Sequence, residues 1–210
     1  MNINQILNVA IIPFRKKRME NFLKTIAPQP TERILDVGGD LYNWNLMGYK
    51  NEVVLLNLAA EINNSPDSSS NFSFVIGDGT ALQYGDKEFD ILFSNSTIEH
   101  VGTLEKQKDF ANEVCRVGKR IWIQTPAKEF FFEPHYITPF IHWLPKDLQK
   151  KLLRFSVWGL ITRADRQYID NIVDQNRLLS LPEVEELFPG CTIIKEKFLF
   201  MTKAYLIVKA

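Results

Sequence analysis

The chain has 210 residues, of which 45% are hydrophobic and 24% charged, values that suit a globular protein able to bury one core. Its 25 Lys and Arg residues balance 25 Asp and Glu residues, so we expect no nucleic-acid partner, which would call for a basic excess. No apolar run reaches the roughly 20 residues that a membrane-spanning helix needs.

The first 29 residues are expected to form an N-terminal helical segment ahead of a domain that covers residues 30–210. The apolar part of this segment precedes its basic run, "RKKR" at 15–18, which is the reverse of the order in a secretory signal. The run is expected to face water on a helix that packs on the domain. The alternative is peripheral contact with acidic lipid headgroups.

Short apolar runs alternate with helix and turn patterns from residue 30 to about 125. The pattern predicts a helix over 41–49 and a second over 103–117, with Thr103 as its cap and Gly118 at its end. The polar stretch at 61–71 is expected to be a mobile loop. Strands joined by helices at this spacing pair in parallel with right-handed crossovers. The predicted strands are "RILDV" at 33–37, "EVVLLNL" at 52–58, "FSFVI" at 72–76, "EFDILFSNS" at 88–96 and "RIWIQT" at 120–125.

The final third of the chain departs from this alternation. Residues 127–181 are dense in aromatics and prolines and are expected to be a substrate-side insertion, helical after Pro145. The tail at 191–210 contains two β-rich runs with no room for a helix between them, so they should pair antiparallel at the sheet edge. The predicted fold is therefore a three-layer α/β Rossmann-like domain with a helical insertion before its last two strands.

Each predicted parallel strand ends in residues that can contact a ligand. In an open parallel sheet, ligands bind beyond the carboxyl ends of the strands. Gly38 and Gly39 allow a tight turn and a close approach of a ligand to the backbone. The candidates for cofactor binding are Asp36, Gly38, Gly39, Asn57, Asp78, Gly79, Thr80 and Asn95.

Asp40 narrows the choice of ligand at this edge. A dinucleotide places its pyrophosphate at the N-terminus of the helix after the first strand, where a carboxylate would repel it. A nucleoside with a cationic tail and no phosphate would tolerate the acid. S-adenosylmethionine has this chemistry, and NAD does not.

The stretches "ILDVGGD" at 34–40, "FSFVIGDGTALQYGDKEFDILFSNSTIEHV" at 72–101 and "EVCRVGKRIWIQTP" at 113–126 resemble motifs of one family. They are similar to those of the class I S-adenosylmethionine-dependent methyltransferases of the type 11 kind. The resemblance implies a seven-stranded sheet with an antiparallel last strand, S-adenosylmethionine as cofactor, and contact between Asp78 and adenine. The chain departs from the family pattern at Asp40 and Tyr42, where glycine is usual, and at Asn57, where an acid is usual.

The resemblance implies methyl transfer to an O or N atom of a small molecule, a glycan or a lipid-linked precursor. The alternative is a non-catalytic binding or regulatory module that retains the fold. Methyl transfer is an in-line displacement that depends on alignment, and a general base helps when the acceptor is a hydroxyl. His135, His100 and Glu133 are the candidate catalytic residues, and the aromatic block around them is either core or acceptor pocket.

The remaining ligand-type residues predict neither a metal site nor a disulfide. The three histidines lack the spacing of metal ligands. The two cysteines, Cys115 and Cys191, are expected to be free thiols in a reducing, cytoplasmic compartment.

Overall fold

The computed structural model of the protein describes residues 3–58, 71–133 and 135–210, with side chains from residue 12 onward. The loop expected at 61–71 lies almost entirely outside the described residues. Both cysteines are free, as expected.

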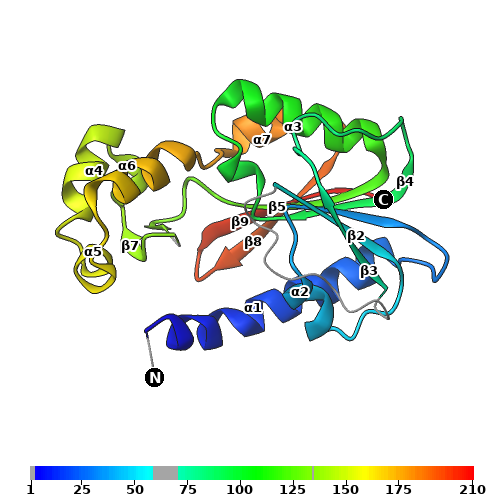
Figure 1. The fold of residues 1–210 in the computed structure, drawn as a ribbon, viewed down its shortest axis with the longest axis horizontal. Helices are drawn as coiled ribbons and strands as arrows, with labels where there is room; N and C mark the ends of the chain where they lie inside the picture. The colour runs from blue at the N-terminus through cyan, green and yellow to red at the C-terminus, as the bar shows by residue number, and fades with distance from the viewer. Residues whose placement is uncertain (1–2, 59–70, 134) are drawn as a thin grey trace.

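A seven-stranded sheet forms the centre of the molecule, in the order β3-β2-β1-β4-β5-β9-β8 (Figure 1). The first five strands are parallel, and β9 is antiparallel to both β5 and β8. This arrangement confirms the predicted fold class and the antiparallel last strand. The strands are β1 Ile34–Val37, β2 Val53–Asn57, β3 Phe72–Ile76, β4 Phe89–Asn95, β5 Gly118–Pro126, β8 Thr192–Phe198 and β9 Met201–Lys209.

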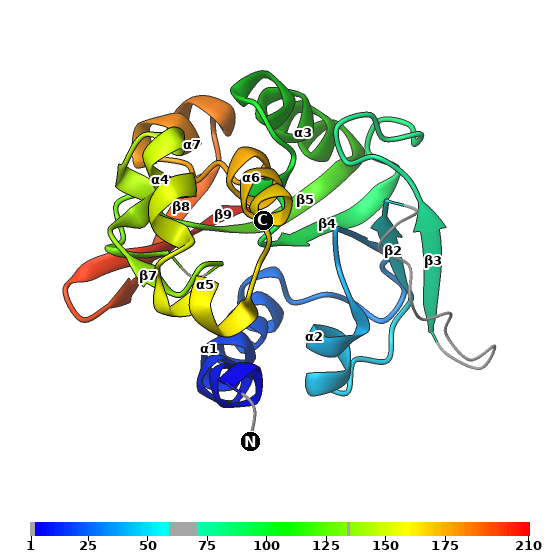
Figure 2. The same cartoon turned by 60° about the vertical axis from the view of Figure 1, so that its left-hand side comes forward.

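Helices cover the two faces of the sheet and so complete three layers. Helices α1 (Ile3–Ile26) and α2 (Leu41–Leu46) lie on one face, and α3 (Leu104–Val117) and α7 (Leu181–Leu187) lie on the other (Figure 2). Because side chains alternate along a strand, Leu35 and Val37 of β1 enter the core under α3 and α7, whereas Ile34 enters the core under α1 and α2. The sheet is therefore buried on both faces, as parallel sheets generally are.

Local signals set the ends of the helices as the sequence predicts. The Thr103 side chain accepts a hydrogen bond from the Lys106 backbone N–H at the start of α3, and Gly118 caps its end. Ser180 and Glu183 form a capping box at the start of α7. The helix expected over 41–49 is shorter, since α2 ends at Leu46.

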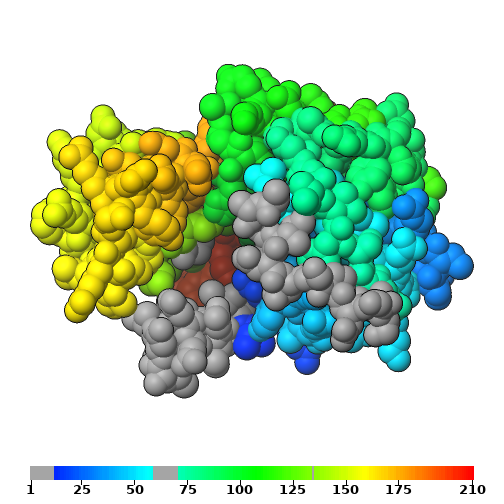
Figure 3. All heavy atoms as spheres, in the orientation of Figure 1, coloured from blue at the N-terminus to red at the C-terminus, as the bar shows by residue number. Residues whose placement is uncertain are grey.

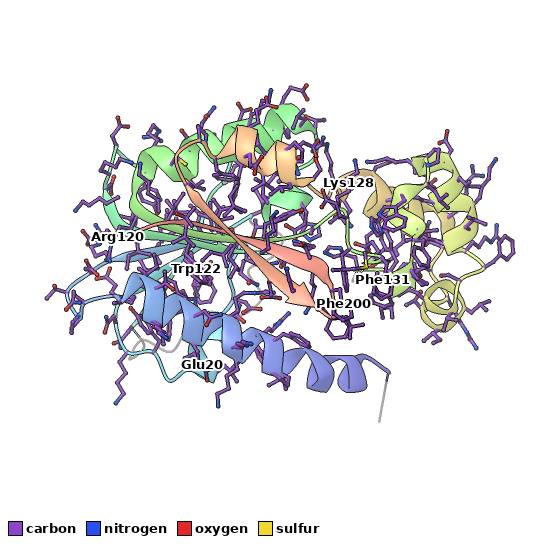
Figure 4. All side chains as sticks on the ribbon, turned by 180° about the vertical axis from the view of Figure 1, so that it is seen from behind. Glu20, Arg120, Trp122, Lys128, Phe131 and Phe200 are labelled. Atoms are coloured by element: carbon purple, nitrogen blue, oxygen red, sulfur yellow. The ribbon has the colours of Figure 1, made fainter. Side chains whose placement is uncertain are left out.

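Helix α1 packs on the sheet through residues spaced by three and four. Met19, Phe22 and Ile26 are buried there, and the centroid of the Phe22 ring lies 5.8 Å from that of the Trp122 ring. Figure 4 shows Trp122 between the sheet and α1. The expectation that the whole "RKKR" run faces water is wrong for Arg18, which is 8% exposed because it lies in line with Phe22. The division of the chain into residues 1–29 and 30–210 stays a prediction.

A separate lobe, residues 132–175, projects beyond the carboxyl ends of the strands (Figure 1). Pro145 caps α4, so the predicted helical start is confirmed. The lobe has its own core, which includes Tyr136, Leu153 and Trp158, while Phe140 and Trp143 stay about half exposed. Its elements are β6 Phe132–Glu133, β7 Thr138–Pro139, the 3-10 helix η3 Ile141–Trp143, α4 Lys146–Leu153, α5 Val157–Thr162 and α6 Arg166–Gln175.

The chain leaves the sheet and returns to it along neighbouring paths. Ala127 forms a parallel bridge with Leu179, and the Lys128 N–H donates to the Leu179 carbonyl at 3.0 Å. The lobe is thereby joined to the sheet by two adjacent passages. Among the described residues, no helix has both the length and the apolar character needed to cross a membrane.

Candidate active site

A cavity of about 530 Å³ opens at the carboxyl ends of β1, β4 and β5, between the lobe, α1 and β9. Figure 3 shows the molecule hollowed there, with the red C-terminal strands at the bottom. The cavity brings three of the predicted cofactor residues together with one predicted catalytic residue. Its walls include Phe14, Arg18, Gly38, Gly39, Asp40, Asn43, Asn95, Gln124, Phe130, Phe132, His135 and Lys203.

The two glycines of the first loop are required by their surroundings. Gly38 has a φ of +75°, a conformation that side chains disfavour, and a Cβ there would overlap Thr97. A Cβ on Gly39 would overlap the carboxylate of Asp36. The loop therefore presents bare backbone to the cavity.

The Asp36 carboxylate packs against the backbone of Gly39 and does not line the cavity. Its Oδ2 accepts a hydrogen bond of 2.8 Å from the Trp44 indole, and its Oδ1 has no partner within the described residues. Burial raises the pKa of Asp36 to about 8, against an ordinary value of 3.8. These contacts give Asp36, a predicted cofactor residue, a structural role in fixing the loop.

Two of the three residues that depart from the family pattern, Asp40 and Asn57, make hydrogen bonds at the glycine loop and the start of α2. Asp40 caps α2 by accepting a 3.0 Å hydrogen bond from the Tyr42 N–H, so a carboxylate occupies the place that a phosphate would need. Asn57 donates to the Gly39 carbonyl at 2.8 Å. Asn57, a predicted cofactor residue, therefore fixes the glycine backbone in this conformation.

Asp78 lies apart from the cavity, in a second hollow after β3. Its Oδ1 accepts hydrogen bonds of 2.8 Å from both the N–H and the hydroxyl of Thr80, and the backbone bond is the main reason that its pKa lies below the ordinary value. Gly79 has no room for a Cβ beside Val37 and Phe110. The predicted cofactor residues thus flank the end of β1 on two sides.

Arg18 is a cavity residue that the sequence reasoning missed. Its Nη1 donates to Asn95 Oδ1 and to Gln124 Oε1, both at 2.9 Å, while Nε and Nη2 donate to Glu196 at 3.3 and 3.1 Å. The network joins α1 to the ends of β4 and β5 and to β8. Its signal was the four-residue spacing of Phe14, Arg18, Phe22 and Ile26, which puts Arg18 on the buried stripe of the helix.

The three predicted catalytic residues lie together at the edge of the cavity. His135 Nδ1 lies 2.6 Å from Glu133 Oε1, and the His100 ring packs edge-on against His135 with centroids 4.7 Å apart. Glu133 is buried and also accepts a 2.8 Å hydrogen bond from the Tyr136 N–H. Burial lowers the pKa of His135 and the Glu133 contact raises it, with a net rise. The pKa of His100 is lowered to about 4 by partial desolvation of its ring, which keeps one exposed side, and by the neighbouring His135.

Glu99 is a fourth member of this group and was not predicted. It lies in the 3-10 helix η2 (Ile98–His100) directly after β4 and is fully buried. Its Oε2 accepts from the Thr125 hydroxyl at 3.1 Å, and burial raises its pKa to about 7. The sequence signal was its place beside His100 at a strand end.

The donor set of the cavity fits S-adenosylmethionine. The bare backbone at Gly38 and Gly39 admits a close ligand, and the cavity volume is in the usual range for small-molecule sites. Asp40 and Asn43 offer oxygen atoms to a cationic tail. Asp78 would accept a hydrogen bond from an exocyclic amine in the second hollow.

Comparison with known proteins agrees with this reading of the site. A methyltransferase-domain family model matches residues 35–120, which include the glycine loop, Asp78 and Glu99. No curated protein sequence matches the chain.

Solved structures share the fold at low sequence identity. The PH0226 protein of Pyrococcus horikoshii is 18% identical, with a TM-score of 0.59 over 93% of this chain and 89% of that one. The magnesium protoporphyrin IX methyltransferase of Synechocystis, solved with S-adenosylhomocysteine, is 12% identical, with a TM-score of 0.59 over 99% and 87%. A SAM-dependent methyltransferase of Methanosarcina mazei is 13% identical, with a TM-score of 0.51 over 89% and 95%.

The domain match and the fold agree with each other. The match covers β1 to the start of β5, and the remaining strands complete the seven-stranded arrangement. The chain therefore contains a methyltransferase domain at residues 35–120, within a fold that it shares with solved S-adenosylmethionine-dependent methyltransferases.

Proposed function

We propose that the protein transfers a methyl group from S-adenosylmethionine to an oxygen or nitrogen atom of a small molecule, a glycan or a lipid-linked precursor. One observation carries the proposal. A single cavity of about 530 Å³ joins the glycine loop, where the cofactor would bind, to His135, which a buried carboxylate holds in place.

The cofactor supplies an activated methyl group on a positively charged sulfur. Gly38 and Gly39 would bind it through their backbone, Asn95 would contact it in the cavity, and Asp78 with Thr80 would hold its adenine. Asp36, Asn57 and Gly79 would act indirectly, since their contacts fix the two loops.

At the acceptor end, His135 would orient the nucleophile. It would accept the nucleophile's proton directly at Nε2, or it would act through a group bound at Nε2. The Glu133 contact supports this role because it occupies Nδ1 and leaves Nε2 free of the carboxylate. An O or N nucleophile loses a proton on methylation, so a nearby proton acceptor favours these atoms. Phe130 and Phe132 line the same cavity and offer apolar contacts to the acceptor.

Calorimetric titration with S-adenosylhomocysteine tests the cofactor part of the proposal, with NAD as the negative control. We expect micromolar binding of the first ligand only. Asp78→Ala should weaken it at least tenfold, whereas Asp109→Ala, on the exposed face of α3, should leave it unchanged. Equal affinities in the two variants would refute the assignment of Asp78.

Methyl transfer tests the acceptor part. The protein is incubated with methyl-labelled S-adenosylmethionine and separate pools of hydroxyl metabolites, glycans and lipid extract, and the labelled pool identifies the acceptor class. His135→Gln should abolish most labelling with unchanged affinity for S-adenosylhomocysteine. Loss of both properties together would mean that His135 serves the fold and not the acceptor.

A further inference from the structure

Glu99, His100 and His135 form a cluster with the composition of a metal site. One ligand-type atom from each residue lies within 4.8 Å of the other two. Glu99 and His100 are carried by η2 at the end of β4, and His135 follows β6 at the start of the lobe. Folding thus brings together groups that are far apart in the sequence, so the spacing of the histidines could not predict a metal site.

An unpartnered buried oxygen gives a second, independent indication. Glu99 has no exposed surface, and its Oε1 has no hydrogen-bond donor within the described residues. Its Oε2 is bonded to Thr125, which fixes the plane of the carboxylate. A buried carboxylate oxygen without a donor is unfavourable, and a bound cation is one of the few partners that would satisfy it.

The surroundings of His135 match those of a metal ligand. Its Nδ1 is engaged by Glu133 at 2.6 Å, which leaves Nε2 as the ligand atom. Metal-binding histidines usually direct their other ring nitrogen to a carboxylate or a carbonyl in this way. Glu133 is itself held by the Tyr136 N–H and by the Asn176 amide at 3.1 Å.

We propose that Glu99, His100 and His135 bind one Zn²⁺ or a chemically similar divalent transition-metal ion at the edge of the cavity. Two imidazoles and one carboxylate suit such ions, whereas Mg²⁺ and Ca²⁺ prefer oxygen ligands. Zinc is bound at roughly 2.0–2.2 Å by these groups, so the cluster contracts on binding. His100 has an exposed side chain and is the member most free to move.

The site has a role in methyl transfer that rests on the proposed function. Three protein ligands leave a coordination position open towards the cavity that His135 lines. An acceptor hydroxyl bound there would be positioned, and it would release its proton more readily, to solvent water, as it takes the methyl group. His135 would then orient the acceptor through the metal ion and would not itself accept the proton.

Metal titration of the full chain after chelator treatment tests the site. Cobalt(II) chloride is added to the protein, and its binding is followed by visible d–d absorption. Zinc chloride binding is measured by calorimetry. Binding of S-adenosylhomocysteine is measured on the same samples. We expect one ion per chain. Glu99→Gln and His100→Ala should each weaken metal binding at least tenfold, whereas His142→Ala, bonded to the Lys128 carbonyl outside the cluster, should not.

The outcomes are distinct. Absence of stoichiometric binding, or binding that survives both cluster variants, would overturn the metal site. Because His100 is exposed, His100→Ala will fold and keeps the test decisive if Glu99→Gln does not. If the chain binds S-adenosylhomocysteine but no metal ion, this inference alone is refuted. If the chain does not bind S-adenosylhomocysteine, the proposed function is refuted whatever the metal result.

Discussion

Buried carboxyl groups dominate the residue-scale chemistry of this protein. Asp36 and Glu99 lie at the carboxyl ends of β1 and β4, both fully buried, and each has one oxygen without a donor among the described residues. An ionised carboxylate is costly in such a place, so burial raises the pKa of both groups. We therefore expect the edge of the sheet where these groups lie to be sensitive to pH.

Asp36→Asn should change how stability varies with pH. The folded protein keeps the Asp36 proton up to a pKa of about 8, whereas the unfolded chain releases it near the ordinary value of 3.8. The contribution of this group to the free energy of unfolding is therefore complete below pH 3.8 and is lost as the pH rises to about 8. The asparagine of the variant does not ionise, so the variant does not lose this stability as the pH rises. Its amide oxygen can still accept a hydrogen bond from the Trp44 indole.

Urea unfolding of both proteins between pH 5 and pH 8 (a range of about 3 units inside that window) measures the effect. The stability of the variant relative to wild type should rise with pH, with a slope of at most about 1.4 kcal/mol per unit. A constant difference across the range would mean that Asp36 is ionised in the folded protein.

At the scale of elements, α1 is a structural part of the helical layer that it forms with α2 on one face of the sheet. Phe22 has no exposed surface and contacts the rings of Trp44, Phe93 and Trp122, with centroids 5.9, 5.0 and 5.8 Å away. Phe22→Ala should lower the free energy of unfolding by about 3–5 kcal/mol, because it leaves a cavity between helix and sheet. Denaturant titration measures the loss.

The matched control is Glu20→Ala on the outer face of the same helix, which should change stability by no more than about 0.5 kcal/mol. Equal, small effects of both substitutions would mean that α1 is not docked in solution. Such a result would favour residues 1–29 as a segment independent of the remaining chain.

Local sequence patterns predicted most helices and strands but not which charged residues are buried. Alternating strands, the caps at Thr103 and Gly118, and the antiparallel tail follow from local patterns, and all of them are confirmed. His135, His100 and Glu133 were chosen from the sequence as candidate catalytic residues, but the sequence did not predict that the three lie together. Arg18 and Glu99 were missed because a charged residue is expected at the surface, and only tertiary contacts reveal why these two are buried.

At the scale of the whole molecule, a buried amide network links the lobe to the sheet. Gln107 of α3 donates to the carbonyls of Ile98 and Arg177 at 3.0 and 2.8 Å, and its own oxygen accepts from Arg177 at 2.6 Å. The Arg177 N–H donates in turn to the Glu99 carbonyl at 2.8 Å. One side chain thus connects α3, the 3-10 helix that carries Glu99, and the passage by which the chain returns from the lobe.

Gln107→Ala should therefore have an effect that extends beyond its own helix. It leaves two buried carbonyls without their donor, which should cost about 1–3 kcal/mol. For a chain of this size the midpoint of thermal unfolding should fall by about 2–4 °C per kcal/mol. Gln149→Ala is the matched control, since the Gln149 side chain is also buried but, among the described residues, makes only one hydrogen bond, of 2.7 Å, to the Leu144 carbonyl inside the lobe. Amide hydrogen exchange separates the two: the first variant should lose protection around residues 98–100 and 176–180, and the second only within the lobe. Unchanged exchange at residues 98–100 in the first variant would show that the lobe is held against the sheet by other contacts, such as the bridge between Ala127 and Leu179.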